Sequence, residues 1–382
     1  MSANTRIVVI GGGYAGVIAA DHLRLRDDVD ITVINPRPRF VERIRLHQLV
    51  TGSDDAVVDY AHVLGEGIRL VVDEASAIHP ERREVALASG DTLGYDYLVY
   101  AVGSRGAVPT VPGAEAFAHR VDELEQAQRL RATLDDLPVD APVTVVGAGP
   151  TGLETASELA EAGRPVTLVC DVLGPYLSAP GRRSAARTLA RLGITVIAGS
   201  AVTEVREDAV VLADGRAVPG AVTVWTAGFA TPDLATRSGL TTDVAGRLLT
   251  DETLTSVDDP YIVAAGDAAA PSGEPLRMSC QAAIPLGIQA ANTVLSRLAG
   301  AEPAALSMAF TGQCISLGRR AGVIQLARPD DTALPLFVAG RAAAGIKETV
   351  CRSTVAALAR AARRPGAVFW LKGRRRIAAP VA

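Results

Sequence analysis

Short apolar runs alternate along this chain with glycine-containing turns and amphipathic stretches. Arg6 to Ile10 and Asp30 to Ile34 are β-like runs, and Tyr14 to Arg26 between them carries apolar residues at helical spacing. A strand, a helix and a second strand in this order form a βαβ unit, whose parallel strands are buried on both faces. The pattern therefore predicts that the chain begins with part of a parallel sheet.

The same succession returns near the middle of the chain. Val143 to Val146 predicts a strand, Gly152 to Ala162 a helix, and Pro165 to Cys170 another strand. The neighbouring patterns predict helices at 122–137 and 182–192 and strands near 194–197, 209–212 and 221–226. We therefore expect a second βαβ domain.

A glycine fingerprint of the form GxGxxG stands between strand and helix in each unit. Its glycines are Gly11, Gly13 and Gly16 in the first unit and Gly147, Gly149 and Gly152 in the second. The first glycine permits a tight turn, the second lets backbone approach a pyrophosphate, and the third allows close helix–strand packing. One match is weak evidence, but two in the correct context predict two bound dinucleotides, with their phosphates at helix N-termini.

The spacing of the two fingerprints leaves room for one domain to lie inside the other. Residues 248–269 and an apolar helix at 281–299 are expected to return to the first domain. The predicted fold is α/β, with two Rossmann-like dinucleotide-binding domains, the second inserted in the first, and a small C-terminal α+β domain. The predicted boundaries are 1–112 and 240–301 for the first domain, 113–239 for the second, and 302–382 for the C-terminal domain with its basic tail.

Three further motifs join the fingerprints in order: Tyr97 to Ser104, Trp225 to Gly228, and Tyr261 to Asp267. With them, the chain resembles the pyridine-nucleotide-dependent FAD oxidoreductases of the glutathione-reductase type. Within that superfamily it is most similar to type II NADH:quinone oxidoreductases and apoptosis-inducing-factor-like reductases. The likeness covers nearly the whole chain and is specific in order and spacing up to about Gln289.

The resemblance implies which residues contact each dinucleotide. Gly11, Gly13, Gly16 and Asp267 are expected at FAD, and Gly147, Gly149 and Gly152 at NADH or NADPH. The other residues expected to bind one of the two cofactors are Tyr14, Ala15, Arg43, Ala101, Gly103, Pro150, Thr151, Ala227, Gly228, Gly266 and Ala282. Asp267 also has a physical reason, because a carboxylate at a strand-to-helix junction can accept hydrogen bonds from ribityl hydroxyls near the positive helix end.

The ribose positions depart from the family pattern. The end of the second strand carries Asn35 instead of an acidic residue, and Asn-Pro is also an ordinary turn signal. The corresponding end in the second unit is Cys170 followed by Asp171, without an adjacent arginine to pair a 2′-phosphate. We expect NADH to be preferred over NADPH, because a carboxylate accepts two ribose hydroxyls whereas an arginine clamps the phosphate.

Two residues are candidates for a role at the reacting rings. Glu154 matches a glutamate that type II dehydrogenases keep near the nicotinamide, although the helix dipole alone also favours an acid there. Gln281 and Ala282 resemble the start of the family's quinone and flavin-edge segment, but Pro285 stands where its second glutamine would be. The helix that follows is expected to direct its N-terminus toward the flavin.

The stretch 36–67 lacks the CxxxxC redox pair of the glutathione-reductase branch. Reduced flavin is therefore expected to pass electrons directly to an acceptor. Two interpretations of Arg43 and Arg45 stay open: contact with FAD phosphates or a polar acceptor, and surface ion pairing, which we favour slightly. The five histidines are expected to be structural or superficial, and the four cysteines are expected to be buried or free thiols in a reducing compartment.

The function predicted is an NAD(P)H dehydrogenase that carries hydride from NAD(P)H to FAD and on to a quinone or another small acceptor. Two alternatives are a reductase of a protein such as a ferredoxin, and an NADH-responsive redox sensor. The near balance of 38 basic and 42 acidic residues argues against a nucleic-acid partner.

The N-terminus has no signal-peptide pattern, which predicts a cytoplasmic protein. The basic, apolar tail from Arg363 to Arg376 leaves open a peripheral contact with the inner face of the membrane. A homodimer also stays open.

Overall fold

The structure is a computed structural model, and it describes residues 4–373. Its first sheet is parallel throughout, and its core strand has every residue from Ile7 to Ile10 buried. In spatial order the strands are β21 (Ile262–Ala264), β9 (Tyr97–Tyr100), β1 (Thr5–Ile10), β2 (Val29–Asn35) and β5 (Arg69–Val72). Because β21 comes from late in the chain, the chain returns to the first domain after it has passed through the second.

Two helices cover this first sheet, α1 (Tyr14–Leu23) and α8 (Cys280–Leu298). They pack closely where Gly287 of α8 faces Ala15 and Ile18 of α1, since a side chain on Gly287 would collide with them. Smaller elements complete this half: β3 (Arg39–Val41), β4 (Val57–Asp59), β6 (Ala75–His79), β7 (Glu84–Leu87), β8 (Thr92–Gly94), β20 (Leu248–Thr250), β22 (Ala269–Pro271) and α7 (Leu234–Arg237). The helix α2 (Leu46–Thr51) also comes early in the chain, but its buried residues join the core of the second nucleotide domain.

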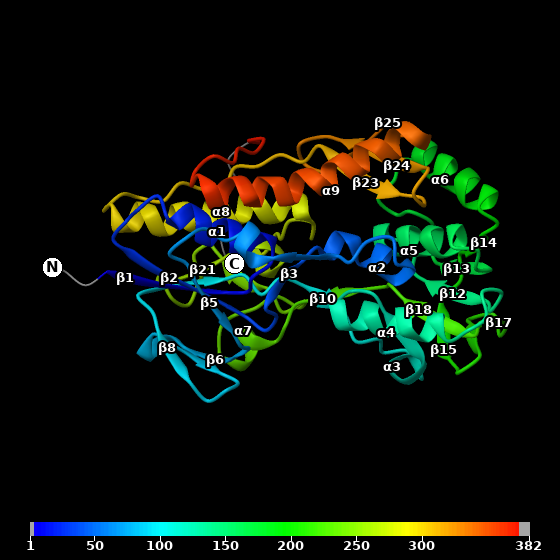
Figure 1. The fold of residues 1–382 in the computed structure, drawn as a ribbon, viewed down its shortest axis with the longest axis horizontal. Coiled ribbons are helices and arrows are strands. Elements are labelled where there is room, and N and C mark those ends of the chain that lie inside the picture. Colours follow the sequence, from blue (N-terminus) through cyan, green and yellow to red (C-terminus); the bar gives the residue numbers. More distant parts are fainter. Residues whose placement is uncertain (1–3, 374–382) are drawn as a thin grey trace.

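The second sheet lies beside the first and is also parallel (Figure 1). Its strands are, in spatial order, β11 (Ala118–Arg120), β18 (Val222–Trp225), β12 (Val143–Val146), β13 (Val166–Cys170) and β14 (Thr195–Ala198). Around it lie α3 (Ala114–Phe117), α4 (Leu124–Asp135), α5 (Pro150–Glu161), α6 (Ala179–Arg191) and the antiparallel strands β15 (Val202–Val205), β16 (Ala209–Leu212) and β17 (Ala217–Pro219). The two chain crossings between the halves pair as β10 (Arg105–Gly106) and β19 (Phe229–Ala230).

The C-terminal part is an antiparallel sheet followed by one long helix. The sheet consists of β23 (Gly312–Ser316), β24 (Gly322–Ala327) and β25 (Ala333–Ala339), and the helix is α9 (Gly340–Arg363). α9 packs on this sheet and then reaches α1, so it spans both nucleotide halves along the top of the view in Figure 1.

This architecture confirms the predicted fold class, including the second Rossmann-like domain inserted in the first. The predicted helices exist with shifted ends, because α1 stops at Leu23, α4 covers Leu124–Asp135 and α6 begins at Ala179. The exact domain boundaries stay predictions. Arg374 to Arg376 of the predicted basic tail lie outside the described residues.

Candidate functional site

The first fingerprint forms an open cradle at the start of α1. Gly11 has a φ of +104°, and a side chain on it would collide with the Ala101 carbonyl. A side chain on Gly16 would collide with the Gly11 carbonyl, so both positions require glycine. By contrast, nothing lies within 4 Å of the place where a Gly13 side chain would begin. Gly13 is the N-cap of α1 and gives no side-chain cap, so free N–H groups face space that fits a pyrophosphate.

The second fingerprint repeats this geometry at the start of α5. Gly147 has the same φ of +104°, and a side chain on Gly152 would collide with the Gly147 carbonyl. Gly149 has open space and is the uncapped N-cap of α5, whose first residues are Pro150 and Thr151. The chain therefore holds two cradles of the same local shape, one at each sheet.

A chain of polar contacts lies near the first cradle. Arg43 Nη1 donates to Ser104 Oγ at 3.1 Å, and Ser104 Oγ donates to Asp267 Oδ2 at 2.7 Å. The other Asp267 oxygen accepts the Ser279 N–H at 3.2 Å, immediately before α8. Arg43, Ser104 and Asp267 thus come together from three distant segments, with Gly103 and Gly266 in the adjoining turns, both at positive φ.

Tyr14 lies in the first turn of α1, directly after the first cradle. Its side chain is buried, yet its hydroxyl has no hydrogen-bond partner among residues 4–373. Burial is the largest cause of a pKa well above the usual value for this hydroxyl. An unpartnered buried hydroxyl next to the glycine cradle fits a flavin dinucleotide, whose polar edge could supply the partner.

The two ribose positions behave differently. The Asn35 side chain is already engaged, because its Oδ1 accepts the Gly12 N–H at 3.0 Å and its Nδ2 donates to the Arg37 carbonyl at 2.8 Å. Cys170 ends β13 as a buried free thiol whose pKa is raised by burial. Asp171, which follows it, is exposed. The ribose contacts of Asn35 and Cys170 stay predictions.

Glu154 lies one turn into α5 and belongs to a buried charged cluster. Its Oε1 is 3.0 Å from Lys347 Nζ of α9 and accepts the Ser316 N–H of β23 at 3.0 Å. Its Oε2 is 3.7 Å from His47 Nδ1 of α2. We call Glu154, Lys347, His47 and Ser316 the Glu154 cluster. Four elements from three parts of the chain therefore meet at one carboxylate.

Burial and the neighbouring charges have opposite effects on the pKa values of the Glu154 cluster. Burial acts to raise the pKa of Glu154, but the Lys347 ammonium, His47 and the Ser316 N–H outweigh it, so the net pKa is lowered. Burial likewise acts to lower the pKa of Lys347, and Glu154 reverses the sign. For His47 burial prevails and lowers its pKa to about 4, so the ring is neutral at pH 7. The cluster therefore carries an ionised Lys347–Glu154 pair beside a neutral imidazole.

The predicted residues Gln281 and Ala282 lie in the first turn of α8. Ala282 is buried, and the Gln281 side-chain amide lies 2.6 Å from Thr311 Oγ1. The neighbouring Cys280 has a pKa raised first by burial, and the charges of both Lys347 and Asp267 act on its thiol.

Ala101 ends the buried segment after β9, and Ala227 and Gly228 follow β18. Gly228 has a φ of +85°, and the Ala227 carbonyl accepts the Trp225 Nε1–H at 2.9 Å. Both residues therefore lie in the connection that leaves the second sheet.

The interpretation of Arg43 and Arg45 as surface residues was wrong for Arg45. Its side chain is buried and donates to Glu42, Gln48 and Glu348. The histidines were expected to be structural or superficial, and His47 is buried against Glu154. Both lie in a segment whose polar composition suggested a surface, whereas α2 and α9 bury it.

Sequence reasoning missed Lys347, Ser316 and Ser104. Lys347 is one of only two lysines in the chain, and this scarcity among many arginines was the available signal. Ser104 directly follows the Ala101 to Gly103 motif, so its place beside Asp267 could have been proposed. Ser316 offers only its backbone N–H to Glu154, for which no sequence signal exists.

Comparisons with known proteins agree with this geometry. Residues 5–287 match the model of the family described as pyridine nucleotide-disulphide oxidoreductase. The chain is 31% identical to an NADH dehydrogenase-like protein of Mycobacterium tuberculosis over 84% of this chain and 87% of that protein. It is 29% identical to the type II NADH:quinone oxidoreductase Ndh of the same organism, over 78% of this chain and 74% of that protein.

A solved structure supports the fold. The sulfide:quinone oxidoreductase of Aquifex aeolicus superposes with a TM-score of 0.80 at 22% identity, covering 95% of this chain and 93% of that one. At this identity the likeness concerns the arrangement of the chain and not its substrate. The chain therefore belongs to the pyridine nucleotide-disulphide oxidoreductase family, as an FAD-dependent NAD(P)H dehydrogenase whose two glycine cradles fit the two dinucleotides.

Proposed function

We propose that this protein oxidises NADH and passes the electrons to a quinone. The observation that carries the proposal is the Glu154 cluster, a buried ion pair between the second nucleotide domain and the C-terminal helix α9. Reduction of a quinone to a quinol takes up two protons with two electrons. A site for it therefore benefits from side chains that hold protons away from bulk water.

The two cradles would position the cofactors. The free N–H groups at the starts of α1 and α5 would bind the pyrophosphates of FAD and NADH. Arg43, Ser104 and Asp267 would fix polar atoms of FAD, because together they offer donors and acceptors within one hydrogen-bonded chain. The chemistry that FAD would supply when bound is to accept a hydride from nicotinamide and to deliver two electrons to the acceptor.

The residues of the Glu154 cluster would hold charge and protons near the acceptor. Lys347 keeps a proton on Nζ because Glu154 raises its pKa despite burial. Its ammonium can stabilise negative charge that develops on an acceptor oxygen. Glu154 holds Lys347 in place at 3.0 Å, and Gln281 offers an amide on the α8 side of the same region. Glu154 and Gln281 are thus our candidates for contact with the reacting groups.

Anaerobic titration of the FAD-loaded protein with NADH and with NADPH tests the first half of the proposal. We expect NADH to bleach the flavin absorbance at lower concentration than NADPH. Bleaching by neither nucleotide would contradict our assignment of the second cradle.

Reoxidation with a panel of acceptors tests the second half. We expect a quinone to reoxidise the flavin faster than a ferredoxin does. The Lys347→Met variant should lose quinone reduction while NADH still bleaches the flavin. The matched control is Lys372→Met, which removes the only other lysine at an exposed site. Faster turnover with ferredoxin, or slow turnover with every acceptor and a persistent long-wavelength band, would favour the two alternative functions instead.

We also propose that the segment leading into the tail contacts a membrane surface. Phe369 and Leu371 are 89% and 58% exposed, whereas Trp370 is anchored by a hydrogen bond from its Nε1 to the Ser307 carbonyl. Among residues 4–373 no helix has the length and apolar character needed to cross a bilayer. Phe369→Asp with Leu371→Asp should reduce sedimentation with anionic vesicles; unchanged sedimentation would contradict this contact.

A further inference from the structure

We propose that a pocket lined by arginines, at the end of the molecule away from the first sheet, binds a phosphate-bearing ligand. The pocket lies between α6, the turn from β23 to β24 and the start of α9. It consists of two adjoining cavities of about 330 and 620 Å³, which share Arg319, Arg320 and Arg341 as lining residues. We call it the arginine pocket. The proposal does not depend on the identity of the electron acceptor.

The charge of the arginine pocket is strongly unbalanced. Its lining contains five cationic side chains and two carboxylates: Arg191, Arg319, Arg320, Arg341 and Lys347, against Glu161 and Glu348. Both carboxylates are already engaged, and so are two of the cations, because Arg319 pairs with Glu158 and Glu348 and Lys347 pairs with Glu154. Glu161 accepts the Arg319 backbone N–H at 2.5 Å, and Glu348 accepts hydrogen bonds from Arg45, Arg319 and Arg352, which lower its pKa to about 2.

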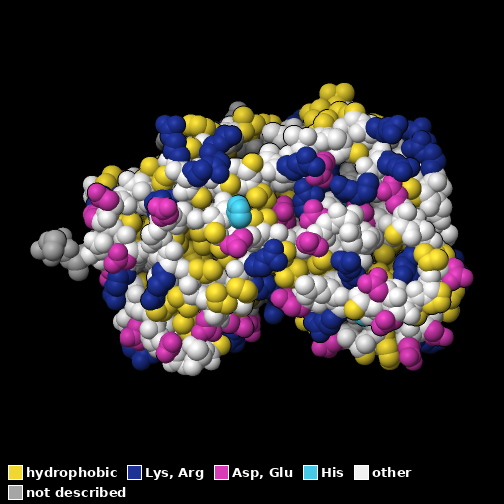
Figure 2. Space-filling view, viewed as in Figure 1, with side chains coloured by type: hydrophobic (Ala, Val, Ile, Leu, Met, Phe, Trp, Pro, Cys, Tyr) yellow, Lys and Arg dark blue, Asp and Glu magenta, His cyan; other side chains and the backbone are white. Residues whose placement is uncertain are grey.

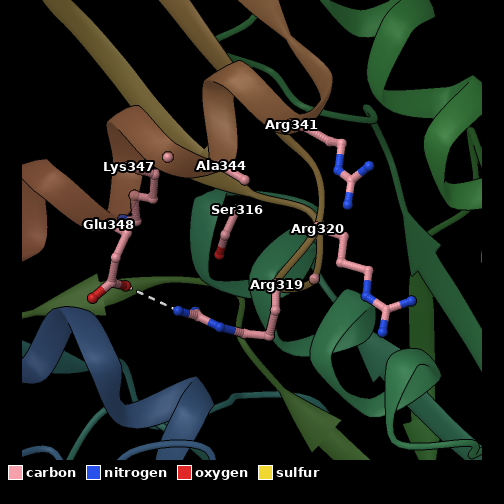
Figure 3. A pocket seen from close by; sticks show the side chains of 9 residues that line it. Ser316, Arg319, Arg320, Arg341, Ala344, Lys347 and Glu348 are labelled. Carbon is pink, nitrogen blue, oxygen red and sulfur yellow. Dashed lines mark hydrogen bonds and ion pairs between the residues drawn. The ribbon is translucent and has the colours of Figure 1, made fainter.

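Arg320 and Arg341 are the residues left without a partner. Neither forms a hydrogen bond or an ion pair with any residue in the described range 4–373, whereas Arg319 points to Glu348 (Figure 3). The Arg320 and Arg341 side chains extend in the same direction, one from the turn and one from the first residues of α9 (Figure 3). Lys and Arg side chains also gather in this region, at the upper right of the space-filling view (Figure 2).

A phosphate group suits this arrangement. A guanidinium offers a planar fork of donors that binds phosphate oxygens in a bidentate manner, and two forks can share one phosphate or a pyrophosphate. The combined cavities also have the size usual for small-molecule sites. In addition, α9 starts at Gly340 on the pocket wall without a side-chain cap, so its positive end adds to the attraction.

The arginine pocket is separate from the NADH cradle but connected to the Glu154 cluster. The cradle lies at the N-terminus of α5, whereas Glu158 and Glu161 near its other end bind Arg319. Ser316 and Lys347 line the inner part of the pocket and both contact Glu154. A bound anion would compete with Glu158 and Glu348 for Arg319.

Calorimetric titration of the FAD-loaded protein with inorganic pyrophosphate tests the proposal. We expect saturable binding that Arg320→Gln with Arg341→Gln weakens at least about tenfold, because two charge-assisted contacts are lost. The matched control is Arg360→Gln with Arg363→Gln, which removes two exposed arginines from the last turn of the same helix. Flavin content and thermal unfolding show that each variant is folded. No saturable binding, or equal loss in both variants, would overturn the proposal.

A second measurement distinguishes a soluble ligand from a lipid headgroup. Vesicles of phosphatidylglycerol in phosphatidylcholine are compared with vesicles of phosphatidylcholine alone. Anionic vesicles that bind through Arg320 and Arg341 and are displaced by pyrophosphate would assign the phosphate to a headgroup. Pocket-dependent pyrophosphate binding without such vesicle binding would assign it to a soluble ligand. Vesicle binding that the two substitutions do not change, together with no pyrophosphate binding, would refute phosphate recognition here.

Discussion

Removal of the Lys347 ammonium is the perturbation for which the structure gives the clearest expectation. Lys347→Met keeps the length of the side chain but leaves the Glu154 carboxylate without its main partner at 3.0 Å. Both side chains are nearly buried, with exposed fractions of 11% for Lys347 and 8% for Glu154. Breaking a buried ion pair by removing one partner costs about 3–5 kcal/mol. Since Glu154 keeps the Ser316 N–H and can take up a proton, we expect a loss of about 3 kcal/mol near pH 8.

The sign of the pH dependence makes this prediction specific. In the wild type the folded-state pKa of Glu154 lies below its unfolded pKa. The stability that Glu154 contributes is therefore present above the unfolded pKa and is lost as pH falls through the folded pKa. Without Lys347, burial raises the folded pKa of Glu154 above the unfolded value. The destabilisation then grows as pH rises above the unfolded pKa and levels off above the new folded pKa. The stability difference between wild type and variant should therefore shrink from pH 8 to pH 5.5.

Urea unfolding at pH 8 and pH 5.5 measures the loss of stability and its pH dependence, with Lys372→Met as the control at an exposed lysine. The control should lie within about 1 kcal/mol of the wild type at both pH values, as surface charges usually do. Adding Glu154→Gln to Lys347→Met should recover part of the loss, because no buried charge then lacks a partner. A difference below about 1 kcal/mol at pH 8, or one that stays constant at pH 5.5, would refute the reasoning.

Three further outcomes are expected. Because the folded pKa of His47 is about 4, wild-type stability should fall as pH drops below about 6.5, by about 3 kcal/mol in all. The stability of His47→Gln, measured by urea unfolding, should depend less on pH over this range. The same pH dependence in the variant and the wild type would contradict a buried neutral ring. The new side chain of Gly149→Ala meets no neighbouring atom, so this variant should raise the KM for NADH with little change in Tm. Gly152→Ala should lower the Tm, because its side chain would collide with the Gly147 carbonyl. A larger loss of Tm in Gly149→Ala than in Gly152→Ala would contradict the cradle geometry. Asp267→Ala should lower the flavin-to-protein absorbance ratio, because Ser104 and the Ser279 N–H lose their acceptor; full flavin content would exclude this role.

Sequence patterns were sufficient for the fold and for both cradles. The strand periodicity of Ile7 to Ile10 and the three glycines that follow it act within one βαβ unit, so their consequences are local. The structure therefore reproduces the expected turns, with φ of +104° at both Gly11 and Gly147. Asp267 could be anticipated for the same reason, because its motif lies in one short segment.

The charged sites depended on the tertiary structure. Glu154, Lys347 and His47 are far apart in sequence and meet only because α2 and β23 pack on α5 while α9 packs on β23. Arg45 could not be recognised as buried, since its segment is polar and only the packing of α2 against distant elements removes it from water. The unpaired Arg320 and Arg341 also look ordinary in the sequence.

The sequence by itself thus determined the two parallel sheets and their glycine turns, because backbone conformation and apolar periodicity are short-range properties. Only the tertiary structure decided which charges are buried, which are paired and which face an open pocket. Those outcomes depend on long-range packing and on the local dielectric that packing creates, and neither is encoded by the spacing of residues in one segment.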